Sequence, residues 1–462
     1  MVKRLGITVV LVAVIVGSVV GQAKNGGIAR QIAMGGSQGS SGLVLNPFIM
    51  EDPALLLLNP AYQGMYSDYA WINVGGGTLN NLSTGNNGYT QQNAGVAFAF
   101  NREWAFGVTL SYDPSAVNVV NGLISGGGLG LPGFGINQRP AQNIPAVANV
   151  WEVLASYRMS STMTLGFGFT YGTSKFDTTF SATGGVSGER LASSSMLGFR
   201  AGAVVDLGSG SSFDASAALR LDKATDNITS NTGSGGEYSA SGTEIQFQAR
   251  GKFKMSNRFN FVPYGMLGIL SAEPKEDAFP LGGAAQTLSN KISGLAYALG
   301  VGGEYHTSSF YLAGGVSYQS AQLKGEASNS TPPGSATYTA TLSGLPVFNL
   351  GSEFWIINWL AGRVGYYRSM ASFKIKNEQS GGGLSATGES TRSFPNSFMF
   401  VGGINPATHD GLVTLGLGLR FGGFALDATV SEEALRRGLG LIGSQDNINT
   451  FGYISTSYNF GE

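Results

Sequence analysis

Cysteine is absent from this chain, and histidine and charged residues are scarce. Among its 462 residues there are Cys 0 and His 2, and charged side chains make up 12%. Without cysteine the chain forms no disulfide bonds and no thiolate metal sites. The net charge of −1 offers no basic surface for nucleic acid, so we expect no nucleic-acid partner.

Catalytic and metal-binding patterns are also missing. His306 falls in a predicted turn and His409 in a predicted loop, and neither has the spacing of a metal ligand. No Gly-x-Ser-x-Gly element with a supporting histidine stands out. We therefore expect no cofactor, no metal and no catalytic residues. A lipid-hydrolysing barrel is a weaker alternative.

Long apolar runs are missing after the N-terminus. The single long run, Leu5–Val20, follows Lys3 and Arg4 and precedes small residues, which predicts a signal peptide over residues 1–23. An uncleaved membrane anchor is the alternative, but the run is short for a spanning helix. Later segments lack about 20 uninterrupted apolar residues, so any further membrane insertion must use β-strands.

Glycine, by contrast, is abundant. Gly 71 is about twice the usual share, and these glycines are interleaved with Phe, Tyr, Leu and Val rather than spaced as in collagen. Within strands, glycine permits bending and close approach of another backbone. The composition therefore favours a curved sheet.

The segment Glu244–Lys254 has one polar face and one apolar face when it is read as a strand, because side chains alternate faces along a strand. The polar face holds Glu244, Gln246, Gln248, Arg250, Lys252 and Lys254. The same alternation recurs in segments of about ten residues nearly to the chain end. Behind a secretion signal, it predicts an all-β transmembrane antiparallel barrel with a polar lumen and an apolar surface toward lipid.

Tight hairpins indicate the number of strands. Seven pairs of alternating runs meet across a few turn residues: 94–101 with 104–112, 150–159 with 162–174, 195–207 with 212–222, 243–254 with 259–270, 293–305 with 310–320, 346–355 with 360–370, and 412–421 with 424–430. A first strand at 69–79 and a last strand at 449–460 bring the total to about 16, within a range of about 14–16.

Long polar stretches between the hairpins are predicted as loops, at 121–146, 178–191, 226–239, 325–338 and 379–393. Short turns alternating with long loops are typical of outer-membrane barrels, whose turns face the periplasm. A soluble β-sandwich or propeller is the alternative, but its apolar faces would have to pack on each other.

Charged residues on the predicted inward faces have two interpretations. The basic set is Arg200, Arg220, Arg250, Lys252, Lys254 and Arg420. It either creates a positive field that attracts carboxylates or pairs with the inward acids Asp206, Asp214, Asp222 and Glu244. We favour pairing, because charged lumen residues commonly pair.

Residues 24–67 do not alternate and precede the barrel, which we expect to span residues 68–462. The short apolar run Ala54–Leu58 predicts one helical turn, followed by Asn59-Pro60-Ala61. Proline has no amide donor, and asparagine bonds to nearby backbone, so this element is expected to end the turn and start the first strand. A simple turn without ligand contact is an equal alternative.

This N-terminal region resembles the hatch of the FadL-type fatty-acid transporter family, where an acidic residue precedes an Asn-Pro-Ala element inside the barrel. It also resembles the related PorV-like proteins of type IX secretion. The resemblance implies a hatch that plugs the lumen, with Asp52, Asn59, Pro60 and Ala61 as parts of a gate. The count of about 16 strands exceeds the fourteen usual in that family by one hairpin.

A glycine-rich loop and the last strand give two further predictions. In the glycine-rich loop Gly126–Gly135, Leu129, Leu131 and Phe134 form a possible apolar entry site, with a plain loop as the alternative. The last strand carries Tyr458 and Phe460, which we place near the membrane interface. The family resemblance implies that the barrel-assembly machinery recognises this strand, although the usual signal places the aromatic residue last and this chain continues with Gly461 and Glu462.

Together these features predict a protein of the outer membrane of a diderm bacterium, in contact with outer-membrane lipid. The expected function is passive uptake of hydrophobic small molecules such as long-chain fatty acids. A PorV-like barrel that binds secreted cargo or a secretion partner is the alternative.

Overall fold

The computed structural model describes residues 26–39, 42–75, 93–111, 147, 150–182, 186–231, 236–279, 286–330, 333–381, 384–394, 412–430 and 451–461. The predicted signal peptide and the loop residues Leu129, Leu131 and Phe134 lie outside these ranges, as does the predicted loop 121–146. These expectations therefore stay predictions.

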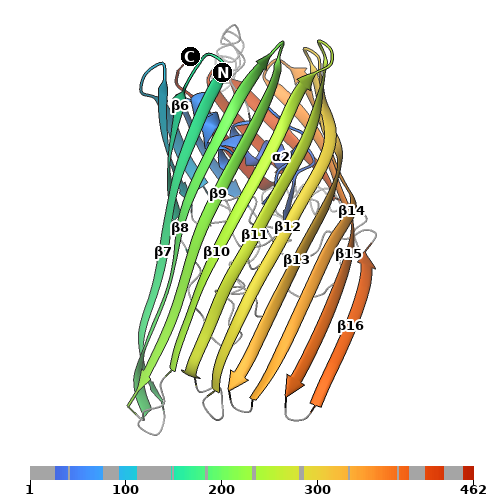
Figure 1. Ribbon diagram of the computed structural model, residues 1–462. Helices are drawn as coiled ribbons and strands as arrows, with labels where there is room; N and C mark the ends of the chain where they lie inside the picture. Colours follow the sequence, from blue (N-terminus) through green and yellow to red (C-terminus); the bar gives the residue numbers. More distant parts are fainter. Residues whose placement is uncertain are drawn as a thin grey trace, which may run out of the picture.

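The described strands form one closed antiparallel barrel (Figure 1). They are β3 (Tyr69–Gly75), β4 (Asn93–Ala99), β5 (Trp104–Ser111), β6 (Val150–Arg158), β7 (Met163–Ala182), β8 (Val186–Gly208), β9 (Ser211–Ser230), β10 (Gly236–Lys254), β11 (Phe259–Phe279), β12 (Gln286–His306), β13 (Phe310–Ser330), β14 (Pro333–Ile357), β15 (Leu360–Gly381), β16 (Leu384–Phe394), β17 (Leu412–Phe421), β18 (Phe424–Val430) and β19 (Phe451–Asn459). Closure occurs where β19 pairs with β3.

The barrel has sixteen strand positions, because β16 and β17 share one. β16 pairs with the Ala371–Gly381 part of β15, and β17 pairs with its Leu360–Tyr367 part. The two are pieces of one barrel strand separated in sequence by residues 395–411. The predicted all-β barrel and its count of about 16 strands are confirmed.

The prediction of long loops is wrong for four of the five polar stretches. Residues 178–191, 226–239, 325–338 and 379–393 lie largely within paired strands, with only two to five residues between the strand ends. Strands β7 to β15 are therefore 19 to 25 residues long, although about 9–11 suffice to cross a bilayer. The polar stretches resembled loops because most residues on both of their faces are polar or small, which removes the alternation but not the backbone pairing.

The predicted faces are observed. On β10, Glu244, Gln246, Gln248 and Arg250 are buried toward the lumen, whereas Phe247 and Phe253 are exposed on the outside. On β11, the outward apolar residues run from Phe259 to Ile269, which at about 3.4 Å per residue and a tilt of about 40° spans roughly 26 Å. This height matches the apolar band of an outer-membrane barrel. We call the parts of β7 to β16 beyond the band the outer extension.

Residues 26–39 and 42–66 lie inside the barrel, near the end where the tight turns and the chain's C-terminus lie (Figure 1). This inner segment contains α2 (Ile28–Ala33), the small sheet of β1 (Ser37–Gly39) with β2 (Gly42–Val44), and the 3-10 helices η1 (Pro53–Leu57) and η2 (Pro60–Gly64). No helix in the described part of the chain is long and apolar enough to cross a membrane.

The role expected for Asn59-Pro60-Ala61 is wrong in one respect. These residues end η1, as predicted, but they begin η2 rather than the first barrel strand, which starts at Tyr69. Proline at the first position of a helix loses no hydrogen bond, because that amide has no partner within the helix.

Candidate functional site

Asp52 and Asn59 cap the two 3-10 helices in the same way. Each has an extended backbone, precedes a proline, and accepts a hydrogen bond on its side-chain oxygen from the amide two residues later. The distances are 2.8 Å from the Ala54 nitrogen to Asp52 Oδ1 and 2.9 Å from the Ala61 nitrogen to Asn59 Oδ1. The repeated Asx-Pro-Ala pattern therefore gives the inner segment two short rigid turns.

Asn59 also joins the inner segment to the barrel wall. Its Nδ2 donates to the carbonyl oxygens of Ala203 on β8 and Ala215 on β9, at 3.1 Å each. Gln248 on β10 and Ser216 on β9 both donate to the Leu58 carbonyl, at 3.0 and 2.9 Å. Of the four predicted gate residues, Asn59 thus contacts the wall through side-chain hydrogen bonds.

Inward glycines on the strands bring the inner segment close to the wall. A side chain at Gly166 on β7 would collide with the backbone of Pro60 and Ala61, and one at Gly202 would collide with the Asn59 side chain. Glycines on five other strands meet the segment similarly: Gly107, Gly302, Gly315, Gly351 and Gly365. Part of the glycine abundance is therefore explained by close approach between this segment and the strands.

Asp52 begins a chain of buried ion pairs that connects the inner segment to one side of the barrel. Arg30 on α2 contacts Asp52 at 2.8 Å and Glu353 on β14 at 3.0 Å. Arg363 on β15 contacts Glu353 at 2.6 Å and Asp427 on β18 at 2.7 Å, and Asp427 also contacts Arg420 on β17 at 2.9 Å.

This ion-pair chain alternates three arginines with three carboxylates, so its formal charge is zero. Asp52 is fully buried and also accepts a hydrogen bond from the Gly27 amide at 3.0 Å. Breaking a buried pair by removing one partner leaves an uncompensated charge, at a cost of about 3–5 kcal/mol. The chain therefore fastens α2 firmly to β14, β15 and β18.

A second cluster holds the opposite side of the inner segment. Arg250 on β10 contacts Asp214 on β9 at 3.0 Å and donates to the Ile49 carbonyl at 3.2 Å. The Tyr62 hydroxyl donates to Asp214 at 2.8 Å. Burial, together with the negative charge of Asp214, raises the pKa of Tyr62 well above its ordinary value, so this hydroxyl stays protonated as a donor.

A third cluster lies on β6 and β8. Arg200 contacts Glu152 at 2.6 Å and donates to the carbonyl of Leu57 at the end of η1. Glu304 on β12 accepts a hydrogen bond from the Met50 amide at 2.8 Å. Charged side chains from several sides of the lumen thus bind the segment's backbone.

Pairing, rather than an open positive field, is the observed state of the inward arginines. The predicted partners Asp214, Asp222 and Glu244 contact Arg250 or Arg220. The sequence reasoning missed Arg30, Glu353, Arg363 and Asp427. The inward faces of the hairpin 346–370 carried a signal for Glu353 and Arg363, because both break an otherwise uncharged alternation.

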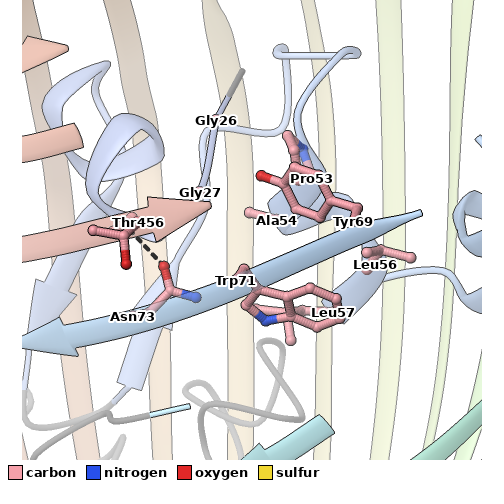
Figure 2. A pocket seen from close by; sticks show the side chains of 11 residues that line it. Gly26, Gly27, Pro53, Ala54, Leu56, Leu57, Tyr69, Trp71, Asn73 and Thr456 are labelled. Atoms are coloured by element: carbon pink, nitrogen blue, oxygen red, sulfur yellow. Dashed lines mark hydrogen bonds between the residues drawn. The ribbon is translucent and has the colours of Figure 1, made fainter. Parts of the chain in front are cut away.

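A narrow apolar pocket lies between the inner segment and the barrel seam formed by β3 and β19 (Figure 2). Its lining includes Pro53, Leu56 and Leu57 from the inner segment and Tyr69 and Trp71 from β3. At its edge, the Ser455 hydroxyl donates to Asn73 Oδ1 and accepts from the Ala29 amide. The pocket therefore joins an apolar part of the segment to the seam.

Three adjacent strands present a wall without charge, which begins against the inner segment at Val262, Gly302 and Gly315 and continues beyond it. From Val262 to Ala272 on β11, Ile292 to Gly302 on β12 and Ala313 to Gly325 on β13, the inward positions hold no charged residue. The largest apolar members are Met266, Leu270, Ile292 and Leu323, all at least 93% buried. In register, Leu270 lies opposite Gly294, which lies opposite Leu323, so we call this continuous surface the uncharged wall.

Strand β19 closes the barrel, as predicted for the last strand. Tyr458 and Phe460 are exposed on its outer side, at the end of the barrel that carries the tight turns. Among the described residues, no group of three or more His, Asp or Glu side chains is arranged to hold a metal ion.

No family model matches the chain, and no curated protein matches it in sequence. Solved structures that match include a deltaS2 mutant of the TodX monoaromatic hydrocarbon channel, at 11% identity and a TM-score of 0.38, covering 95% of this chain and 99% of that one. The ferric yersiniabactin uptake receptor FyuA from Yersinia pestis matches at 9% identity and a TM-score of 0.36, covering 85% of this chain and 80% of that one. The ferric preacinetobactin receptor BauA from Acinetobacter baumannii matches at 8% identity and a TM-score of 0.33, covering 78% of this chain and 68% of that one. Scores at this level assign no family, so only the geometry above bears on function.

Proposed function

We propose that this protein is an outer-membrane channel for passive uptake of hydrophobic small molecules such as long-chain fatty acids. The observation that carries the proposal is the uncharged wall. Water-filled porin channels have polar lumens, whereas here three neighbouring strands offer apolar side chains such as Met266 and Leu270 beyond the inner segment. Burial of a ligand's apolar surface there contributes about 25 cal/mol per Å².

Capture begins in the outer extension. Phe176 and Phe180 on β7 lie in register with the inward positions Ala192 and Gly188, and both rings are more than one-third exposed. Exposed aromatic rings on an inward face give an apolar ligand a first contact outside the bilayer. The ligand then moves to the uncharged wall.

Release requires a path past the inner segment, which contacts the barrel from many sides. In this proposal the segment acts as the hatch that its resemblance to FadL-type proteins implies, with Asp52 and Asn59 holding its turns. The ligand leaves either by movement of the hatch or through a gap in the barrel wall into the bilayer.

A second candidate function is supported by the same contacts. The ion-pair chain and the glycine contacts hold the inner segment tightly, as suits a PorV-like barrel that binds secreted cargo and needs no open lumen. In that case the outer extension supplies the binding surface. The two candidates differ in whether a ligand occupies the uncharged wall.

Placing a charge on the uncharged wall tests the proposal. Leu270→Asp puts an unpaired carboxylate where an apolar chain would bind, and we expect affinity for a fluorescent long-chain fatty acid to fall at least ~10-fold. Ala218→Asp is the matched control, because Ala218 faces the lumen on β9 between Ser216 and Arg220, where a carboxylate finds a cationic neighbour. Binding that is absent from the parent protein, or equal in both variants, would favour the cargo-binding role.

A further inference from the structure

On neighbouring strands the outward side chains change in the same order with distance from the bilayer, from apolar residues to lysines. On four of these strands a tyrosine lies near the outer edge of the apolar band, namely Tyr171, Tyr297, Tyr318 and Tyr366, and on β12 and β15 the last outward apolar residues are Leu295 and Met370. The rings of Tyr297 and Tyr318 lie 5.9 Å apart on adjacent strands. Aromatic residues mark the level of lipid headgroups in membrane barrels.

Outward lysines follow two to six residues beyond the last outward apolar or tyrosine residue of the band on each strand. They are Lys175 on β7, Lys223 on β9, Lys291 on β12, Lys324 on β13, and Lys374 and Lys376 on β15, and all are exposed. On β9, for example, Lys223 is the next outward residue after Leu221. We call these six residues the lysine belt.

Within three strands, acidic residues on the same outward face lie farther from the bilayer than the lysine, although across strands Glu326 lies opposite Lys291 and Glu389 lies opposite Lys376. Asp177 follows Lys175, Glu326 follows Lys324, and Glu378 follows Lys376, each by two residues, which is about 7 Å along a strand. On β11 the order is reversed, since Glu273 precedes Lys275. Five strands thus place positive charge nearest the headgroups.

We propose that the lysine belt binds the phosphorylated glycolipid headgroups of the outer leaflet. An ammonium on a flexible four-carbon stem reaches back toward the interface, where the phosphates of such a lipid lie. Several of the lysines are paired in the structure: Lys324 with Glu326 at 2.6 Å, Lys376 with Glu378 at 2.6 Å, and Lys175 with Asp177 at 3.5 Å. These pairs are about half exposed and contribute little stability, so a phosphate can replace the carboxylate.

The proposal also gives the outer extension a physical role. Strand pairing holds the lysines at fixed heights and spacings, whereas mobile loops would scatter them. The belt spans β7 to β15, which is the sector with the longest strands. It rests on the outer-membrane placement of the barrel and not on the identity of any transported ligand.

The test measures lipid binding to the full-length barrel in detergent. A bisphosphorylated lipid A-type glycolipid, its enzymatically dephosphorylated form and phosphatidylglycerol are titrated while the melting temperature is followed. We expect the phosphorylated glycolipid to raise the melting temperature of the barrel most. In a variant with Lys175→Gln, Lys223→Gln, Lys291→Gln, Lys324→Gln, Lys374→Gln and Lys376→Gln, we expect apparent affinity for that lipid to be at least ~10-fold weaker, because each lysine contributes to attraction by anionic headgroups.

The control neutralises basic residues at the opposite end of the barrel. Arg102→Gln, Arg158→Gln, Lys254→Gln and Arg258→Gln remove exposed charges in or beside the tight turns and should change the affinity less than ~2-fold. Equal affinity in the lysine-belt variant and the parent would overturn the proposal. So would equal binding of the dephosphorylated lipid or phosphatidylglycerol by the parent protein, a comparison that needs no variant. Fatty-acid binding by Leu270→Asp is measured separately, so failure here leaves the uptake proposal in place.

Discussion

At the scale of single residues, this barrel depends on where glycine and paired charge are placed inside it. Gly166 and Gly202 leave space for the turn at Asn59, while Arg30 and Arg363 connect carboxylates from the inner segment and two strands. The glycine abundance was evident in the sequence, but its cause was not, because a strand pattern does not reveal which inward positions another backbone will approach.

Gly166→Ala is expected to destabilise the protein. The added methyl group would collide with the backbone of Pro60 and Ala61, which cannot turn aside as a flexible side chain can. We expect a loss of about 1–3 kcal/mol, measured by urea unfolding in detergent micelles. Gly265→Ala is the control, because its nearest neighbour, Leu299 Cδ2, lies at an ordinary 3.5 Å. Equal stability of the two variants would show that the close approach at Gly166 is not formed.

At the scale of elements, the inner segment and the outer extension are the two features that a plain barrel lacks. The segment is fastened on one side by the ion-pair chain and on the other by Arg250, Arg200 and Asn59. If uptake requires the inner segment to move, that movement must break ion pairs and hydrogen bonds between the segment and the barrel wall. The chain's lack of cysteine makes a direct test available.

A disulfide between Gly64→Cys on η2 and Ser156→Cys on β6 is expected to lock the segment to the wall. The Ser156 Cβ lies 4.0 Å from the place of a Cβ on residue 64, within the range of disulfides. If hatch movement releases the ligand, oxidation should stop uptake into proteoliposomes, and a reductant should restore it. Each single-cysteine variant serves as a control. Uptake that continues in the oxidised double variant would point to release through the barrel wall.

At the scale of the whole molecule, sixteen strand positions close with no free edge, and the outward face carries an apolar band of bilayer height. Such a barrel keeps its backbone hydrogen bonds in detergent. We expect the unboiled protein to migrate faster than the boiled protein on an SDS gel, in material extracted from an outer-membrane fraction. A water-soluble protein with no heat-dependent shift would contradict the membrane barrel and both proposed functions.

The sequence by itself determined the barrel, because alternation in segments such as Glu244–Lys254 fixes which face meets lipid and the tight turns fix the order of strands. It also indicated that Asn59-Pro60-Ala61 ends the first turn of the inner segment, since this is a local interaction, whereas the cap at Asp52 was found only in the structure. Only the tertiary structure decided that the polar stretches continue as strands, because a segment with two polar faces has no period to read. It alone brought Arg30 to Glu353, 323 positions apart, and placed Leu270 and Leu323 on one wall, because strand register sets which distant residues meet.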